Sequence, residues 1–414
     1  MHSLENNAHQ LLSDTIFARV SEYSIGGISL PTAPIVSATN VLLNSSKDTV
    51  GIGQQLLAQQ SQKIDTSFQY GAISTPTVEA VANSVATLEG GDGALLTPSG
   101  QSSIFLVIFT LSRRGGTLLV SDSLTYSTLQ LLTTLSSYLG FRIKRLGVRT
   151  ISEVSINELV ADSTFCVLLE APGGFDYEIP DIEKVFKVSK QARITCVFDN
   201  TWSSSVFFRP IGWGADVVVL SLSKCYGGAA GVSLGAIVTH DKQLELKFRK
   251  NSAVLGLNVS PERAERVSIC LSTLKIRAVV QDASTRLLLS DIETSHPKTK
   301  FLHPSLTSHP SHTTWKKYFC GACSVFTICF PDVSTKELAS GMDKSVLFRP
   351  AYGWGGNSSS YYIFDPRQWR LRSNNSFSAA SCIRIYIGLE DWQDLAKDLN
   401  STLLSIGPSD GSIV

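Results

Sequence analysis

The chain has 414 residues, which is more than one hydrophobic core usually supports, so we expect a large domain and a smaller one. Lysine and arginine total 36 against 35 aspartate and glutamate residues, and there is no basic block that could follow a phosphate backbone, which argues against nucleic acid as a partner. The opening residues lack the basic region and apolar run of a secretory signal, and no segment approaches the roughly 20 apolar residues of a membrane span. We therefore expect a cytoplasmic protein without membrane contact.

The predicted elements begin after a polar N-terminal stretch. Residues 1–65 show weak periodicity, so we interpret them as an arm that packs on a neighbour rather than as part of a core. From about residue 74 the sequence predicts a helix at 78–88, a glycine-rich break at 89–93, a strand at 94–96 and a helix beginning at Gly100. Further strands are predicted at 117–120, 165–169, 194–198 and 217–220, with helices at 129–139 and 181–192. This alternation predicts an α/β fold with a mostly parallel sheet in a large domain over residues 66–265.

The remaining residues predict a second, smaller domain of the α+β class over 266–414. A long helix is expected at 261–291, followed by strands at 325–330 and 382–387 and a final helix at 391–404.

The eight cysteines are scattered, and most lie in apolar stretches where a free thiol behaves as a small buried hydrophobe. Cys320 and Cys323 have CxxC spacing, which also occurs in zinc and redox sites. Because no second pair exists, we favour core packing in a strand-like run over residues 320–330, and we expect no metal.

Chemistry is expected just after the strands, because ligands of such sheets bind beyond the carboxyl ends of the strands. Lys224, in Ser221-Leu222-Ser223-Lys224, follows a buried strand and could be nucleophilic enough to condense with an aldehyde. Asp199 ends another predicted strand and could keep a pyridine nitrogen protonated. Taken singly, Lys224 is better explained as a surface lysine after a strand, and Asp199 could be the N-cap of the next helix.

Two further strand ends carry candidate groups. Ser99, Gly100 and Gln101 form a strand-to-helix turn whose backbone N–H groups favour a phosphate, although any capped turn has this pattern. Tyr126 could stack on a ring or pack as an ordinary tyrosine.

The order of these groups resembles the Cys/Met-metabolism family of fold type I enzymes that depend on pyridoxal 5′-phosphate. The resemblance runs from about Ala33 to the C-terminus. It rests on Phe68-Gln69-Tyr70-Gly71, Leu88-Glu89-Gly90-Gly91, Ser99-Gly100, residues 122–126, Glu170-Ala171-Pro172, Asp199-Asn200-Thr201, Ser223-Lys224 and residues 384–391. Within the family, Ala351-Tyr352-Gly353-Trp354-Gly355-Gly356 is most similar to an aromatic segment of the bacterial cystathionine β-lyases.

The resemblance implies a role for each candidate residue. Lys224 would bind the cofactor covalently and move protons, Asp199 would pair with the pyridine nitrogen, and Tyr126 would stack on the ring. Tyr70 would reach in from a neighbouring subunit, which implies a homo-oligomer with shared sites, as in a dimer of dimers. The cofactor phosphate would be held by Ser99, Gly100, Gln101, Ser221 and Ser223, and the substrate by Arg384, Tyr352, Gly353 and Trp354.

Three positions depart from the family pattern. Ala72 stands where the family usually has an arginine that reaches the cofactor phosphate. Residues 228–231 (Gly-Ala-Ala-Gly) replace a polar segment, and Gly353 replaces a serine.

The function implied is β-elimination from cystathionine or a related cysteine S-conjugate, which yields a thiol such as homocysteine, pyruvate and ammonia. The alternative within the family is γ-elimination or γ-replacement, and the lost polar groups could signal such a shift. A cofactor-free scaffold protein is a third, less favoured hypothesis.

Overall fold

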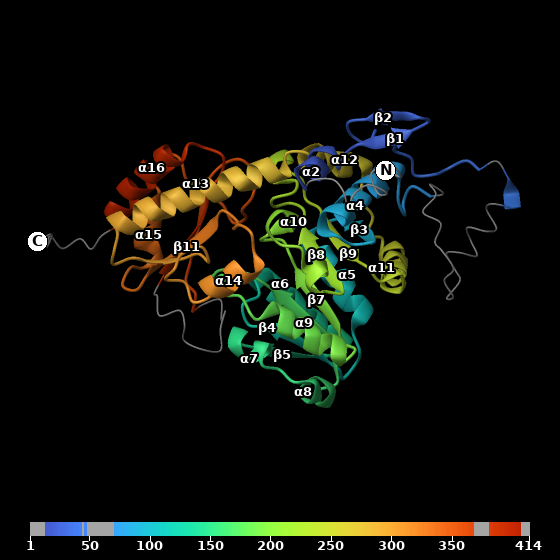
Figure 1. The fold of residues 1–414 in the computed structure, drawn as a ribbon, viewed down its shortest axis with the longest axis horizontal. Coiled ribbons are helices and arrows are strands. Elements are labelled where there is room, and N and C mark those ends of the chain that lie inside the picture. The colour runs from blue at the N-terminus through green and yellow to red at the C-terminus, as the bar shows by residue number, and fades with distance from the viewer. Residues whose placement is uncertain (1–12, 44, 48–69, 368–380, 407–414) are drawn as a thin grey trace, which may run out of the picture.

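The structure is a computed structural model that describes residues 13–43, 45–47, 70–367 and 381–406. The two larger of three β-sheets, each covered by helices, lie at opposite ends of the molecule (Figure 1). Helix α13 (Leu274–Ser295) runs along one side of the molecule and joins the two ends (Figure 1).

The larger sheet has seven strands, and all neighbouring strands are parallel except where β9 pairs with β3 and β8. In sheet order they are β3 (Gly93–Thr97), β9 (Gly235–Thr239), β8 (Val217–Ser221), β7 (Thr195–Asp199), β6 (Thr164–Glu170), β4 (Thr117–Ser121) and β5 (Arg142–Leu146). The predicted mostly parallel sheet is therefore confirmed.

Apart from the half-exposed edge strand β5, the strands of this sheet are buried on both faces. In β8, Val217 and Val219 pack into one hydrophobic core, whereas Val218 and Leu220 pack into the other. Alternate side chains of a strand point to opposite faces, so a continuous apolar run is what a sheet covered by helices on both sides requires. The covering helices are α4 (Pro76–Glu89), α5 (Gly100–Leu111), α6 (Tyr126–Leu139), α7 (Val148–Ser152), α8 (Ile156–Ala161), α9 (Ile182–Gln191), α10 (Ser204–Phe207), α11 (Lys242–Leu255) and α12 (Pro261–Leu271).

The smaller sheet has five strands around a separate core. Its order is β10 (Lys300–Leu302), β11 (Val325–Phe330), β14 (Ser381–Tyr386), β13 (Ser360–Phe364) and β12 (Arg349–Pro350). All pairs are antiparallel except β12 with β13. Buried residues of α13, α15 (Thr335–Met342) and α16 (Trp392–Leu404) pack with this sheet in one cluster, and α14 (His312–Tyr318) precedes β11. The predicted smaller α+β unit is confirmed.

The single long helix predicted at 261–291 is wrong, because the chain breaks between α12 and α13. Thr273 precedes α13 with φ −106° and ψ 0°, and its hydroxyl donates to the carbonyl of Cys270 at 3.2 Å. A threonine hydroxyl that bonds to nearby backbone competes with helix continuation. Apolar periodicity persists on both sides of the break, so periodicity alone could not reveal it.

The N-terminal arm predicted at 1–65 lies partly outside the described residues. Its described part forms α2 (Ser13–Arg19), β1 (Tyr23–Ile25) and β2 (Ile28–Leu30). Phe17 and Val20 are buried in the main core, so this part of the predicted arm does contribute to a core. The domain boundaries at 65 and 265 stay predictions. No helix in the described part of the chain is long and apolar enough to cross a membrane.

Candidate active site

A cavity of about 280 Å³ lies at the carboxyl ends of β6, β7 and β8, with residues of the smaller sheet on its other side. The structure brings every candidate residue except Tyr70 to this cavity. They are Ser99, Gly100, Gln101, Tyr126, Asp199, Ser221, Ser223, Lys224, Tyr352, Gly353, Trp354 and Arg384.

The turn before α5 forms one end of the cavity. Ser99 caps the helix by accepting a hydrogen bond from the backbone N–H of Ser102 at 3.1 Å. A Cβ atom on Gly100 would lie 2.6 Å from Cβ of Ser221, so only glycine lets the turn approach β8 this closely. Gln101 has a buried Oε1 without a hydrogen-bond partner among the described residues. The backbone N–H groups at the start of this helix can donate hydrogen bonds to a phosphate.

Two carboxyl groups lie side by side at the ends of β6 and β7. Glu170 and Asp199 are paired in register, and both line the cavity. Burial raises the pKa of Asp199, while the hydroxyl and N–H of Thr201 oppose this rise; the N–H lies 3.0 Å from Oδ1. Burial and the nearby charge of Asp199 raise the pKa of Glu170 well above its usual range, although its Oε2 accepts from the N–H of Thr125 at 2.8 Å. Asp199 is therefore the one that retains a charge most easily.

Lys224 has an environment that favours its neutral amine. Burial, reinforced by the positive charge of Arg384, lowers the pKa of Lys224 to about 8. Nζ also lies 5.3 Å from the centroid of the Trp354 ring. A Cβ atom on Gly355, which has φ +108°, would lie 2.9 Å from Cα of Lys224, so this glycine permits the close contact between the two loops. A lysine that loses its proton near neutral pH can act as a nucleophile and as a base.

Arg384, which belongs to β14 of the smaller sheet, places a buried positive charge at the wall of the cavity. Its side chain is 9% exposed and makes no ion pair within the described part of the chain. Nη2 donates to the carbonyl of Tyr352 at 2.6 Å, and the guanidinium lies over the rings of Phe175 and Tyr362 at 5.6 and 5.4 Å. Because a buried cation is costly without a counter-charge, the site fits a ligand that carries a carboxylate.

Tyr126 and Tyr70 occupy different situations. Tyr126 begins α6 at the cavity wall, and Nε2 of Gln130 donates to its hydroxyl at 2.6 Å. Tyr70 is 46% exposed and does not line the cavity of its own chain. It pairs with Asn40 in an isolated β-bridge. Phe68 and Gln69 of the same sequence motif lie outside the described residues.

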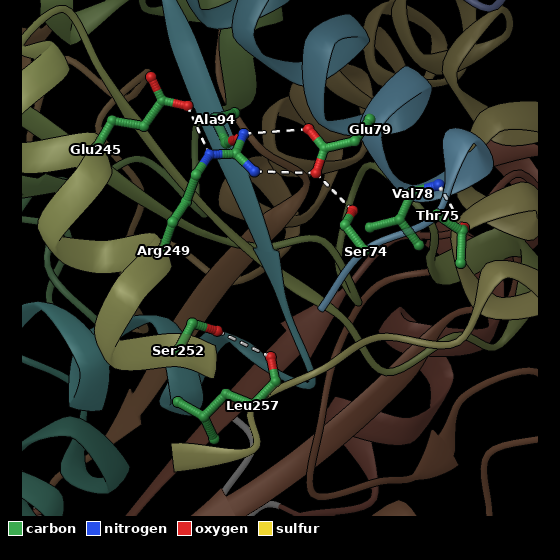
Figure 2. Close-up of polar contacts among 9 residues, drawn as sticks. All are labelled: Ser74, Thr75, Val78, Glu79, Ala94, Glu245, Arg249, Ser252 and Leu257. Carbon is green, nitrogen blue, oxygen red and sulfur yellow. Dashed lines mark hydrogen bonds and ion pairs between the residues drawn. The ribbon is translucent and has the colours of Figure 1, made fainter. Parts of the chain in front are cut away.

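The segment that follows Tyr70 is anchored by a half-buried ion-pair network (Figure 2). The hydroxyl of Ser74 donates to Glu79 at 2.5 Å. Arg249 donates to Glu79 at 2.9 Å and to Glu245 at 2.8 Å, which joins α11 to the start of α4. This network attaches the segment to both helices at Ser74, and neither Tyr70 nor Ala72 lines the cavity of its own chain.

The sequence prediction assigned no site role to several residues that line the cavity. They are Ile104, Thr125, Ser127, Thr128, Glu170, Gly174, Phe175, Thr201, Trp202, Val325 and Tyr362. Glu170 ends a buried apolar run just as Asp199 does, so the strand-end signal was sufficient to find it. Phe175 and Tyr362 have no such local signal, because they reach the site only through tertiary packing.

The residues present fit pyridoxal 5′-phosphate. The glycine-only turn suits a phosphate, Asp199 suits a protonated pyridine nitrogen, and the neutral-prone amine of Lys224 suits an aldehyde. Lys224 and Arg384 are the only cationic side chains among the described residues that line the cavity. Among the described residues, the phosphate end thus offers hydroxyl and N–H donors but no cation.

Sheet and site together define a fold type I enzyme that depends on pyridoxal 5′-phosphate. The model of the family described as "Cys/Met metabolism PLP-dependent enzyme" matches residues 31–404, so the chain belongs to this family. The predictions of family, fold class and cofactor are thereby confirmed.

Relatives in the family differ in the reaction that their names give. An L-alanine/L-glutamate racemase of Wolbachia pipientis wMel is 28% identical over 89% of this chain and 91% of its own length. The cystathionine beta-lyase MetC of Escherichia coli strain K12 is 27% identical over 80% and 85% of the two chains. The structure of cystathionine gamma synthase from Xanthomonas oryzae pv. oryzae, in complex with aminoacrylate and cysteine, has a TM-score of 0.82 at 24% identity and covers 96% of this chain and 98% of that chain. At this identity the structural likeness establishes the fold alone.

Proposed function

We propose that this enzyme is a carbon–sulfur β-lyase that acts on cystathionine or a related cysteine S-conjugate and yields a thiol, pyruvate and ammonia. With cystathionine the thiol is homocysteine. The observation that carries this proposal is the convergence of Lys224 and Arg384 in one cavity: a base poised near neutral pH and a buried cation without a counter-charge. This pair suits an α-amino acid, whose carboxylate and Cα proton lie next to each other.

The proposal assigns the cofactor to the residues at the sheet edge. Ser99, Gly100, Gln101, Ser221 and Ser223 would hold its phosphate, Tyr126 its ring and Asp199 its ring nitrogen. When bound, pyridoxal 5′-phosphate supplies an electron sink for the negative charge that develops at Cα.

The remaining steps belong to side chains of this protein. Arg384 binds the substrate carboxylate with its planar guanidinium and fixes the orientation of Cα. The Nζ amine of Lys224 accepts the Cα proton, and the Cβ–S bond then breaks with the electron pair leaving on sulfur. Lys224 can deliver the proton to the thiolate, and after release the aminoacrylate is hydrolysed by water to pyruvate and ammonia. Phe175, Trp354 and Tyr362 reduce water access to the reacting atoms.

We further propose that the active protein is a homo-oligomer, as in a dimer of dimers, in which Tyr70 completes the site of a neighbouring copy. Two observations support this proposal: Tyr70 is exposed, and it does not line the cavity of its own chain. Sedimentation of an enzyme that is fully active as a monomer would contradict it.

The alternative is γ-elimination or γ-replacement, which requires a further proton transfer at Cβ. The observation that favours it is the loss of a hydroxyl beside Lys224, where Gly353 replaces a serine. A Cβ atom at Gly353 would lie 3.6 Å from Nζ, an ordinary contact, so the serine of relatives would fit and its absence is a chemical difference.

Product analysis separates these activities. Purified enzyme is incubated with cystathionine, cysteine S-conjugates, O-activated homoserines and L-alanine, with Lys224→Ala as the inactive control. Pyruvate together with a thiol supports the β-lyase. 2-Oxobutyrate or a new thioether would replace it by γ chemistry, and D-alanine without pyruvate would replace it by racemisation.

A further inference from the structure

Glu89 is a fully buried acid that lines no part of the cavity. It is the last residue of α4 and is 0% exposed. The sequence prediction placed it in the break after this helix, so its burial was not anticipated.

The two oxygens of the Glu89 carboxylate accept hydrogen bonds from two different loops, one after β7 and one after β8. The hydroxyl of Tyr226 donates to Oε1, and Nδ2 of Asn200 donates to Oε2 at 2.9 Å. Asn200 directly follows Asp199, and Tyr226 lies two residues after Lys224. One carboxylate therefore joins the segments that carry the two groups proposed for opposite ends of the cofactor ring system.

Both donors are themselves held in place. Nδ2 of Asn200 also donates to the carbonyl of Phe208 at 2.9 Å, whereas Oδ1 has no partner among the described residues, so the donor contacts alone orient this amide. The backbone N–H of Ser205 donates to the hydroxyl of Tyr226 at 3.1 Å. The network thus connects α4, α10 and the loops after β7 and β8.

Burying a carboxylate in this position costs folding free energy, which argues that the two hydrogen bonds it accepts serve a purpose. Burial raises the pKa of Glu89 to about 7, although the hydrogen bonds from Tyr226 and Asn200, the more distant charge of Arg209 and the backbone N–H of Ser205 lower it. No described cation forms an ion pair with Glu89. An apolar residue would avoid the cost of burying a charge but could not accept from two donors at once.

We propose that Glu89 is a positioning residue that fixes the separation of Asp199 and Lys224 through Asn200 and Tyr226. The inference rests on the proposed roles of those two residues. Glu89 itself lines no part of the cavity, and it acts by fixing the positions of Asp199 and Lys224.

Glu89→Gln is the most informative variant, because it keeps size and shape but replaces one acceptor oxygen by an NH2 donor. If that donor faces Asn200, two NH2 groups oppose each other and the hydrogen bond is lost. If it faces Tyr226, the hydroxyl must stop donating to residue 89 and turn to Oγ of Ser205, 2.9 Å away. In both orientations one of the two contacts changes. We expect kcat to fall about tenfold with KM changed by less than about twofold, since misplaced groups cost rate more than binding. The visible circular dichroism of the bound cofactor should change as well, because it reports the cofactor's position in the site rather than the amount of folded protein.

Two comparisons make the test specific. Tyr226→Phe removes one donor and should change the circular dichroism in the same direction, and the Glu89→Gln/Tyr226→Phe double variant should lose less than the product of the two single effects. Asp216→Asn is the matched control. It neutralises a carboxyl group at the opposite end of the same sheet, whose Oδ2 accepts from the N–H of Cys196 at 2.7 Å, and should leave kcat and the spectrum unchanged.

The outcomes separate this inference from the proposed function. Borohydride labelling of Lys224 is measured in the wild type and in each variant. A wild type without the label would overturn the proposed roles and this inference with them. Labelled Glu89→Gln protein with wild-type kcat and spectrum would overturn the inference alone, as would Asp216→Asn protein with the same losses as Glu89→Gln.

Discussion

Asp199 and Glu170 lie side by side, paired in register at the ends of the neighbouring parallel strands β7 and β6. Burial raises the pKa of both carboxyl groups, and the charge of Asp199 raises that of Glu170 further. Two such groups do not both ionise readily in a buried site. We infer that Asp199 keeps its charge at neutral pH and that Glu170 holds a proton.

This difference in charge predicts that two equally conservative substitutions lower kcat/KM to very different extents. Asp199→Asn should lower kcat/KM by at least about a hundredfold, because it removes the charge that keeps the cofactor ring nitrogen protonated. Glu170→Gln should cost less than about tenfold, since a protonated acid and an amide are both neutral. Steady-state kinetics of the two variants would contradict the assignment if their order were reversed.

The lowered pKa of Lys224 predicts how fast apoprotein takes up the cofactor. Only the neutral amine can attack an aldehyde, so the rate should rise with pH and reach half of its maximum at about pH 8. Arg384→Gln should move this midpoint upward, because the positive charge that helps to lower the pKa of Lys224 is lost. Stopped-flow absorbance between pH 6 and 10 measures both; a wild-type midpoint near the ordinary lysine value would argue against a desolvated amine.

Glu89 predicts a pH dependence of folding stability. Its pKa is about 7 in the folded state, above the ordinary value of 4.5, so its contribution is fully present below about pH 4.5 and is lost as pH rises to about 7. The loss amounts to about 3 kcal/mol. Relative to the wild type, Glu89→Gln should therefore have a higher free energy of unfolding at pH 8 than at pH 5, which means that the variant is relatively more stable at pH 8. Denaturant unfolding of the apoproteins at the two pH values checks this, and a pH-independent difference would refute it.

Ala72 predicts a loosely held cofactor. Each charge-assisted hydrogen bond to a phosphate contributes about 1.5–3 kcal/mol, so the missing arginine should weaken binding by about one to two powers of ten. Ala72→Arg should slow the loss of pyridoxal 5′-phosphate during dialysis, whereas Ala72→Gln, which adds length without charge, should have a smaller effect. Equal retention in all three proteins would mean that another group neutralises the phosphate.

The fold and the sheet edge of the site were predictable because their signals are local. The buried runs that became β6, β7 and β8 each end in the residue that lines the cavity, so Asp199 and Lys224 stood out without any knowledge of packing. β5 was missed because its Arg-Ile-Lys-Arg-Leu sequence at the sheet edge is mostly polar and half-exposed.

Tertiary relationships were not predictable from the residues alone. Arg384 and Trp354 belong to the smaller unit, and only the family resemblance suggested that they meet Lys224. Glu89 is more instructive, since it stood in a glycine-rich segment that predicts a turn. Its burial depends on Asn200 and Tyr226, which lie 111 and 137 residues away along the chain.

The central claim, that Lys224 carries the cofactor in this cavity, is tested most directly by borohydride reduction of the purified protein followed by peptide mapping. We predict a single pyridoxyl label on Lys224, which is absent from Lys224→Ala protein prepared in the same way. A label on any other lysine, or a colourless wild type that binds no pyridoxal 5′-phosphate, would contradict the account.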